Sequence, residues 1–433
     1  MIHFALALIL QRWLVVNDIH LDAFSKQGII YGSDTTPVLW QSALRAMRAD
    51  APNVRVVVLG GDMLTHQFPA RAHAAGKNPD TSALATMRTI AGGLDRLYPR
   101  AQFLFALGNN DDFCGDYRSE FGGPFQAEIA RIWAPLIDRN GAAPNFLTEF
   151  SNGGYYTTRL PIAHGEAIVL NSVFWSIVYS GGCASAPRDP GAREFAWLER
   201  RLVQLRSDQN AMILLHIPPG YDPQTTATTV HRLVAVPFLT RHSNAELLNL
   251  IAAHARNLRV ILAAHTHRYD FRVAGGVPLL IASSLSPVYG NSPAFYVLDV
   301  DERGEIHDVH PFVYEPATDA WQREPSFDTM YGTRAFTAPA LSAVAARLRS
   351  DAQLRAVWRA AYNAWSPVRT GIGAHWLPYA CAQTELDGGY AACAGTATRS
   401  RAAVIIALTV VAAIGLLIWA VMNRRRRAGE RDQ

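Results

Sequence analysis

The chain has 433 residues, of which 49% are hydrophobic and 10% are aromatic. This composition excludes a disordered chain and suits one large folded domain or two modest ones. The formal net charge of +4 is unevenly spread, because the residues after 398 hold seven arginines and two acids, a net charge of +5, which leaves −1 for the rest. A nearly neutral body does not indicate a nucleic-acid partner and disfavours a secreted nuclease.

Residues 1–12 form an apolar segment that could be a truncated signal segment. Its hydrophobic run, residues 4–10, has the length of a short signal core, but no basic residue precedes it. Only Gln11 and Arg12 separate this run from the first expected strand. The signal is weak in itself, so the prediction of export depends mainly on the other end of the chain.

Five short apolar runs predict strands that are buried on both faces. They are residues 13–17, 54–59, 103–107, 211–215 and 258–263. Helical patterns between them cover residues 37–49, 82–98, 192–206 and 244–255. This alternation of strands and helices predicts a layered α/β domain over residues 13–315.

Four further runs predict antiparallel strands, at residues 155–160, 167–171, 295–300 and 306–314. We therefore expect two mixed β-sheets packed as a sandwich, with helices on the outer faces. Residues 316–401 are expected to form a small C-terminal helical subdomain. It would contain one helix at residues 340–362 and a Gly- and Ala-rich stretch with cysteines at residues 366–398.

Residues 402–422 are expected to be one transmembrane helix. The run has 21 residues without a charge or a proline, and at the helical rise it spans about 30 Å, the thickness of the hydrocarbon core. Four arginines follow in the basic tail, residues 423–433, which predicts a cytoplasmic C-terminus. The catalytic domain would then lie outside, in a periplasm, at the cell exterior or in a lumen. The alternative is a buried helix of a large domain.

The four cysteines agree with export, because an even number suggests disulfides in an oxidising compartment. Four cysteines allow three connectivities. We expect Cys114–Cys183, between two glycine-containing loops, and Cys381–Cys393, which closes a short loop ahead of residues 402–422. Four unpaired thiols are the alternative.

Polar residues follow each of the five buried strands. They are Asp18-x-His20, Gly61-Asp62, Gly108-Asn109, His216 and His265-x-His267. In open α/β sheets the carboxyl ends of the strands form the ligand-binding edge, and carboxylates mixed with imidazoles suit Zn, Mn or Fe. If the two pairs are extended, a spacing of two residues points both side chains the same way. Each block alone is weak, and His216 could be a core histidine, but the ordered set predicts a two-metal site with Asp62 as the bridge.

The order of these blocks resembles that of the calcineurin-like metallophosphoesterase superfamily, whose members carry D-x-H, G-D, G-N-H-[DE], H and G-H-x-H blocks. Asp62-Met-Leu-Thr-His66 and His216-Ile-Pro-Pro-Gly220 are similar to the acid-sphingomyelinase-like phosphodiesterase branch, which includes endopolyphosphatases. The resemblance covers residues 13–315. It implies a four-layer metallophosphoesterase sandwich and a hydrolase that attacks phosphorus with a metal-bridging hydroxide.

The resemblance also implies two divalent metal ions, with Zn as the first choice and Mn or Fe as alternatives. One ion would bind Asp18, His20, Asp62 and His267. The other would bind Asp62, Asn109, His216 and His265.

One departure from the superfamily pattern affects catalysis. Asn110 stands where most members have a histidine, and a neutral amide can donate a hydrogen bond but cannot deliver a proton. His66 matches a histidine of the sphingomyelinase-like branch, so we expect it to be the acid or a phosphate contact; a supporting histidine at the rim is the alternative. A phosphate leaving group is a weaker base than an alkoxide, so Asn110 favours anhydride or nucleotide substrates.

Other residues near the strand ends are weaker candidates. Asp111 or Asp112 could orient a ligand histidine. Four aromatic residues could line the substrate cleft, although loop aromatics more often simply pack; they are Tyr117, Trp175, Tyr179 and Tyr221.

These features together predict a membrane-anchored, binuclear-metal phosphoric ester hydrolase. Its substrate would be a phosphate ester or a phosphoanhydride, such as a nucleotide, a polyphosphate or a phospholipid headgroup. The alternative is a non-catalytic, metal-containing ectodomain that binds phospholipid headgroups or a protein partner. Asn110 is the sequence feature that supports this alternative, and the sequence does not indicate an oligomeric state.

Overall fold

Two six-stranded sheets pack face to face in the computed structural model, which describes residues 10–183, 189–228, 234–368, 372 and 375–395. The first sheet has the order β14-β13-β12-β1-β2-β3, and the second has the order β10-β11-β9-β6-β5-β4. Both are mixed: β1, β2 and β3 run parallel, as do β5, β6, β9 and β11, while the remaining strands pair antiparallel. The predicted pair of mixed sheets is confirmed.

The strands of the first sheet are β1 (Gln11–Val16), β2 (Val54–Leu59), β3 (Gln102–Phe105), β12 (Ala294–Val300), β13 (Ile306–Glu315) and β14 (Ala320–Arg323). Those of the second are β4 (Tyr156–Arg159), β5 (Gly165–Val169), β6 (Asn210–Leu214), β9 (Leu258–Ala263), β10 (Asp270–Ala274) and β11 (Val277–Ile281). A short pair, β7 (Tyr221–Asp222) and β8 (Val236–Pro237), lies apart from both.

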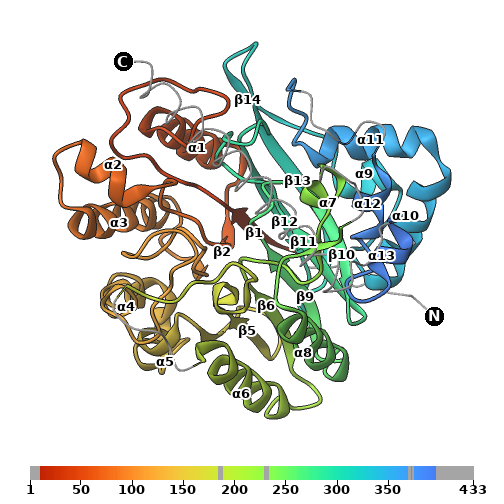
Figure 1. The fold of residues 1–433 in the computed structure, drawn as a ribbon, viewed down its shortest axis with the longest axis horizontal. Coiled ribbons are helices and arrows are strands. Elements are labelled where there is room, and N and C mark those ends of the chain that lie inside the picture. Colours follow the sequence, from red (N-terminus) through yellow and green to blue (C-terminus); the bar gives the residue numbers. More distant parts are fainter. Residues whose placement is uncertain (1–9, 184–188, 229–233, 369–371, 373–374, 396–433) are drawn as a thin grey trace, which may run out of the picture.

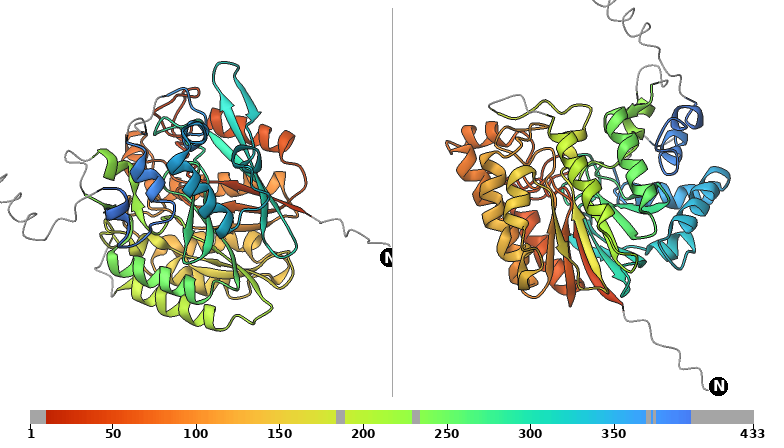
Figure 2. Two further views of the ribbon diagram at one scale, coloured as in Figure 1. Left: turned by 90° about the vertical axis from the view of Figure 1, so that its right-hand side faces the viewer. Right: turned by 90° about the horizontal axis from the view of Figure 1, so that it is seen from below.

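Alternating apolar residues of the central strands face two different cores. In β6, Met212 and Leu214 pack into the core shared with the first sheet, whereas Ile213 packs into the core beneath α6 (Pro190–Val203) and α8 (Arg241–Ala253). Each strand is therefore apolar on both faces, as a strand between two layers must be. Figures 1 and 2 show the resulting layers, with α1 (Pro37–Asp50) and α3 (Pro79–Leu97) on the side of the first sheet.

The predicted helices begin at recognisable caps. The side chains of Thr36, Asn78, Asp189 and Thr240 accept backbone N–H groups at the starts of α1, α3, α6 and α8, and proline follows the first three. The structure adds helices that the sequence analysis did not predict: α2 (Phe68–Ala74), α4 (Pro124–Ile137), α5 (Phe146–Gly153) and α7 (Pro223–Thr228).

Two predicted boundaries were wrong, and one predicted strand direction holds toward only one neighbouring strand. Residues 340–362 are two helices, α10 (Ala338–Ser350) and α11 (Ala352–Tyr362), because Asp351 has an extended backbone and caps α11 with its carboxylate. The first strand starts at Gln11, so residues 11 and 12 belong to β1 rather than to the preceding segment. The segment at 167–171 is antiparallel only toward β4, since β5 pairs parallel with β6.

The C-terminal helices form a small layer against the edge of the second sheet (Figure 1). They are α9 (Phe327–Tyr331), α10, α11, α12 (Leu377–Cys381) and α13 (Tyr390–Cys393). Phe271 of β10 packs against the rings of Phe327 and Tyr331 of α9. Both predicted disulfides, Cys114–Cys183 and Cys381–Cys393, are present.

The predicted transmembrane helix, residues 402–422, and the basic tail, residues 423–433, lie outside the described residues, as do residues 1–9. Among the residues that are described, no helix combines the length and the hydrophobicity needed to cross a membrane.

A single buried amide joins the two sheets where β1 ends. The side-chain carbonyl of Asn17 accepts the N–H of Gly60 at 3.0 Å. Its amide group donates to the carbonyls of Ala263, the last residue of β9, and Ala282, which follows β11, at 2.9 and 3.2 Å. Asn17 therefore ties the carboxyl edge of one sheet to that of the other.

We expect Asn17→Leu to lower the free energy of unfolding by roughly 2–4 kcal/mol, because the Gly60 N–H and the Ala282 carbonyl lose the partners named above and the Ala263 carbonyl keeps only the N–H of Ala282. Urea denaturation measures the change. Asn152→Leu, at an exposed position in α5, is the matched control and should stay within about 0.5 kcal/mol of the wild type. Equal effects of the two substitutions would contradict the assigned role of Asn17.

Candidate metal centre

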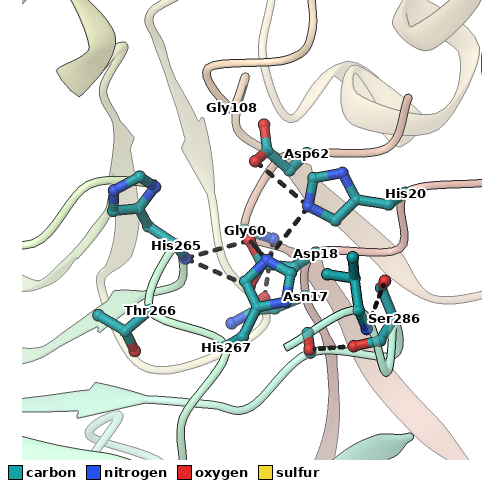
Figure 3. Close-up of polar contacts among 12 residues, drawn as sticks. Asn17, Asp18, His20, Gly60, Asp62, Gly108, His265, Thr266, His267 and Ser286 are labelled. Atoms are coloured by element: carbon teal, nitrogen blue, oxygen red, sulfur yellow. Dashed lines mark hydrogen bonds and ion pairs between the residues drawn. The ribbon is translucent and has the colours of Figure 1, made fainter. Parts of the chain in front are cut away.

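All seven side chains proposed as metal ligands lie at one edge of the sandwich, where five strands end. Asp18 and His20 follow β1, Asp62 follows β2, and Asn109 follows β3. His216 follows β6, and His265 and His267 follow β9, so the second sheet supplies only histidines. Figure 3 shows the His267 ring beside Asp18 and His20, and the backbone nitrogen of His265 joined to the carboxylate of Asp18 across the junction of the sheets.

The backbone at this edge is not extended, contrary to the expectation for the two pairs. Asp18, His20, Asp62, His265 and His267 have positive φ angles of 45°, 44°, 52°, 71° and 55°. Left-handed conformations of this kind cost roughly 1–3 kcal/mol each for residues other than glycine, and they concentrate at functional sites. The common orientation of each pair therefore comes from two left-handed turns at the strand ends, which the surrounding structure must hold.

The first group of side chains surrounds a point between the sheets. His20 Nε2 lies 3.2 Å from His267 Nε2 and 3.4 Å from Asp62 Oδ2. Asp18 Oδ1 lies 3.8 Å from His267 Nε2. Nitrogen and oxygen ligands at about 2.0–2.2 Å from one cation have mutual distances of this size.

The second group lies on the other side of Asp62. Asn109 Oδ1 is 2.9 Å from both His216 Nε2 and His265 Nδ1, and these two nitrogens are 3.3 Å apart. Asp62 Oδ2 is 3.4 Å from His216 Nε2, the same distance that separates it from His20 Nε2. One carboxylate oxygen thus faces both groups.

Backbone carbonyls select the histidine nitrogen that points into the centre. His20 donates from Nδ1 to the carbonyl of Leu64 at 3.0 Å, and His216 donates from Nδ1 to that of Gly60 at 2.8 Å. Their Nε2 lone pairs are left for a cation. His265 is reversed: Nδ1 faces the centre, and Nε2 lies 3.3 Å from the hydroxyl of Tyr117.

Asn109 is oriented by a carboxylate that the sequence analysis missed. Its amide nitrogen donates to Asp116 Oδ1 at 2.7 Å, which turns its carbonyl oxygen toward His216 and His265. Asp116 is in a loop seven residues further along, where no spacing rule indicated a role. The amide nitrogen is thus the anchor, and the amide oxygen is free to face a cation.

The two acids after Asn110 support backbone rather than histidines, so the suggestion that either orients a ligand histidine was wrong. Asp111 accepts the N–H groups of Met63, Leu64 and Gly108. Asp112 accepts those of Cys114 and Glu120. Asp111 thereby holds the loop after β3 against the loop that carries Asp62.

The donor set fits divalent cations. Burial raises the pKa of Asp18 to about 8 and lowers the pKa values of His20 and His265 to about 4 and about 3, so both imidazoles stay in the neutral, ligating form. For His216, burial lowers the pKa, but the facing carboxylate of Asp62 outweighs it and raises the value to about 9.

Histidine side chains face both acidic groups of this centre. Among the described residues, no lysine or arginine forms an ion pair with Asp18 or Asp62, whose ion-pair partners are the histidines. His267 Nδ1 is buried without a hydrogen-bond partner in the same part of the chain. Two buried carboxyl groups with histidines as their ion-pair partners form a costly arrangement, which a bound cation would relieve, and this mixture of oxygen and nitrogen atoms suits Zn, Mn or Fe.

His66 lies beside the first group and is held by Asp34, another carboxylate that the sequence analysis missed. His66 donates from Nδ1 to Asp34 Oδ1 at 2.9 Å, and its ring stacks on that of His20 with the centroids 4.1 Å apart. Although burial lowers the pKa of His66, its hydrogen bond and charge interaction with Asp34 raise it overall. The other ring nitrogen, Nε2, makes a hydrogen bond of 3.3 Å with the Tyr289 hydroxyl at the open side.

Asn110 contacts the carboxylate of Asp62 through two donors. Its backbone N–H donates to Asp62 Oδ1 at 2.7 Å, and its side-chain amide donates to Asp62 Oδ2 at 3.0 Å. Its neighbour Gly108 has no room for a side chain, because an added Cβ would collide with Asp62. This turn packs directly on Asp62.

Of the four aromatic residues suggested for the cleft, Tyr117 is the one that contacts a ligand histidine. Trp175 is fully buried and stacks on Phe195, and Tyr221 stacks on Tyr390. Tyr289, which was not predicted, packs edge-on against both His66 and His267.

Comparison with known proteins defines the class of protein. The calcineurin-like phosphoesterase family matches residues 12–269, more than half of the chain, so the chain belongs to this family. Its members use a binuclear divalent metal centre, and the side-chain groups described above could hold one.

The curated relatives that the chain matches belong to the acid-sphingomyelinase-like and endopolyphosphatase branch. The chain is 26% identical over 286 residues to the sphingomyelinase phosphodiesterase D of Dictyostelium discoideum, covering 64% of this chain and 59% of that protein. It is 22% identical over 256 residues to the cyclic GMP-AMP phosphodiesterase SMPDL3A of Rattus norvegicus, covering 58% and 53%. It is 26% identical over 172 residues to an endopolyphosphatase of Cryptococcus neoformans, covering 39% and 24%. The chain thus spans less than two thirds of each relative's length.

We expect Asp116→Leu to weaken binding of one of two Zn²⁺ ions by about 10- to 100-fold, because Asn109 loses the anchor that aims its oxygen. Titration of the metal-free protein against a chromophoric chelator resolves the two affinities. Asp116→Asn, which keeps an acceptor oxygen, should recover most of the loss. If both ions weaken equally in Asp116→Leu, Asp116 does not act through Asn109.

Proposed function

We propose that the chain is a binuclear-metal hydrolase of phosphate esters and phosphoanhydrides. The observation that carries this proposal is the position of Asp62 Oδ2, 3.4 Å from Nε2 of both His20 and His216, which is the place of a carboxylate shared by two cations. Asp18 and His267 complete the proposed site on one side of Asp62. Asn109 and His265 complete it on the other.

The chain's own residues would position the reaction. When bound, two divalent cations supply Lewis acidity toward phosphate oxygens and lower the pKa of a water molecule. Hydrolysis joins the water oxygen to phosphorus, breaks the bond from phosphorus to the leaving oxygen, and returns a proton to that oxygen. Asn110, with both donors on Asp62, would fix the bridging carboxylate and deliver no proton.

His66 is proposed to serve the leaving oxygen. Asp34 fixes its ring and favours the protonated form, and its Nε2 faces the open side of the centre. An imidazolium in this place can donate a hydrogen bond to a phosphate oxygen or a proton to a departing alkoxide. Anhydrides would need this help less than alcohol esters, because phosphate is the weaker base.

Phosphodiesters and phosphoanhydrides are the proposed substrate class. The relatives are named as a sphingomyelinase phosphodiesterase, a cyclic GMP-AMP phosphodiesterase and an endopolyphosphatase. All three names describe substrates in which a phosphorus centre is linked through oxygen to a second group. Nucleotides, polyphosphate and phospholipid headgroups all meet this description. Zn remains the proposed cation, with Mn or Fe as alternatives.

The proposed location is a membrane surface, with residues 13–315 as the catalytic domain and residues 316–401 as a subdomain outside the cytoplasm. Two disulfides support an oxidising compartment. The charge-free run at residues 402–422, followed by arginines, supports a tether with a cytoplasmic end.

We expect the purified protein to hydrolyse bis(4-nitrophenyl) phosphate when Zn²⁺ or Mn²⁺ is added and to lose this activity with a chelator. Asp62→Asn should lower kcat/KM by about 100-fold or more, because both cations lose their shared ligand. Asp80→Asn, at an exposed position in α3, is the control. Metal binding without hydrolysis of any phosphate ester or anhydride would favour the non-catalytic ectodomain instead.

We expect His66→Ala to lower kcat for a diester with an alkoxide leaving group more than it lowers kcat for an anhydride, which releases phosphate, by roughly 10-fold or more. The comparison needs kcat for both substrates in the wild type, in His66→Ala and in His73→Ala, an exposed-histidine control. If ester and anhydride hydrolysis fall equally, His66 does not assist the leaving group.

A further inference from the structure

A cavity of about 260 Å³ opens directly beside the proposed metal centre. His265 and Thr266 form the side toward the metals, and the rings of Tyr117, Phe238 and Tyr289 form much of the wall. Tyr289 also touches His66 and His267. A substrate held at the metals would therefore place its next group in this cavity.

The cavity contains a buried cation, Arg268. Its side chain is only 3% exposed, yet no carboxylate of the described residues lies within ion-pairing distance of its guanidinium. The acceptors that it does have are neutral: Asn363 Oδ1 at 2.8 Å, the Tyr289 carbonyl at 3.2 Å and Gln224 Oε1 at 3.5 Å. Burying a charge without a counter-charge is costly unless a ligand supplies one.

Arg272, four residues further along in β10, likewise has no ion-pair partner among the described residues, so the position at the cavity is what distinguishes Arg268. Arg272 is also buried, but it does not line the cavity. It holds the loop after β6 by donating to the carbonyls of Pro219 and Tyr221, and it lies over the Phe238 ring. Arg268 lines the open space next to the metals.

Asp222 is the carboxylate that shares this cavity, and its charge is already engaged. Its Oδ1 accepts the N–H groups of Gln224 and Thr225 at 2.9 and 3.0 Å, and its Oδ2 accepts the Thr225 hydroxyl at 2.5 Å. These donors belong to the first turn of α7, which favours a negative charge. Arg268 is left as the group with unmet demand for an anion.

The geometry points to Arg268 as a specificity residue that binds a second phosphate group of the substrate, next to the one held at the metals. This inference rests on the proposed function and narrows it to substrates with adjacent phosphates, either nucleoside polyphosphates or inorganic polyphosphate. Arginine suits this role because its planar guanidinium binds phosphate oxygens in pairs. A choline headgroup, being cationic, would be disfavoured in the same cavity.

The test compares substrates that differ in charge beyond the scissile phosphate. Wild-type protein, Arg268→Gln and Asn363→Asp are assayed with Zn²⁺ on ATP, on tripolyphosphate and on bis(4-nitrophenyl) phosphate, which carries a single negative charge. Arg268→Gln should lower kcat/KM for ATP and tripolyphosphate by about 10- to 100-fold and leave that for the diester within about threefold. Asn363→Asp keeps the guanidinium but places a carboxylate next to it. It should therefore also lower kcat/KM for ATP and tripolyphosphate relative to that for the diester.

Arg100→Gln, at an exposed arginine far from the metals, is the matched control and should change neither substrate class. A loss with ATP alone would indicate a nucleotide, and an equal loss with tripolyphosphate would indicate the phosphate chain. Equal losses for the diester and the polyanions, or none for either, would overturn the role of Arg268. If Arg268→Gln does not fold, Asn363→Asp carries the same comparison.

Equilibrium binding of tripolyphosphate to the Zn²⁺-loaded protein tests Arg268 independently of turnover. Binding should weaken by about 10- to 100-fold in Arg268→Gln, with unchanged Zn²⁺ stoichiometry. A wild-type protein that binds tripolyphosphate through Arg268 but hydrolyses none of the three substrates would refute the proposed function and leave this inference standing. Unchanged binding in Arg268→Gln would refute the inference alone.

Discussion

The proposed metal centre is divided between two sheets, and everything that it can do depends on holding their carboxyl edges together. Asp62 comes from one sheet and His216 from the other, so a small shift between the sheets would separate the ligands of both cations. Asn17 opposes such a shift with two buried hydrogen bonds that reach across the junction, while a third joins it to Gly60 at the end of β2 in its own sheet. Buried polar contacts of this kind constrain geometry more than they stabilise the fold, because each is costly if left unmade.

The same edge combines strained backbone with uncompensated charge. Five of the proposed ligand residues have left-handed backbone conformations, and the carboxyl groups of Asp18 and Asp62 are buried among histidines. Neither feature favours folding by itself, and both are typical of a site whose side chains are arranged to bind cations. Asp34, Asp111 and Asp116 hold the surrounding residues by hydrogen bonds, although none of them belongs to the proposed ligand set. The carboxylates around the centre thus position neighbouring side chains and loops, while Asp18 and Asp62 inside it face the proposed cations.

The C-terminal helices contribute to the cleft as well as to the core. Asn363, just after α11, accepts a hydrogen bond from Arg268, and Tyr362 lines the cavity in which Arg268 lies. The small subdomain therefore shapes the space beyond the metals. The metal ligands would define the reaction, and the surrounding cavity would choose among substrates that share a phosphorus centre. Such a separation between the metal ligands and the substrate cavity is consistent with curated relatives that are named for different phosphate substrates.

The sequence by itself determined the layered architecture and the residues that gather at the strand ends, because hydrophobic runs and the polar residues that follow them are local patterns. It also indicated the disulfide pairs, which the structure contains. Only the tertiary structure decided which carboxylate orients which ligand. Asp34 and Asp116 meet His66 and Asn109 through loops whose course no periodicity predicts. Arg268 likewise looks like any other arginine in the sequence, since a missing counter-charge is a property of the packed surroundings and not of the residue.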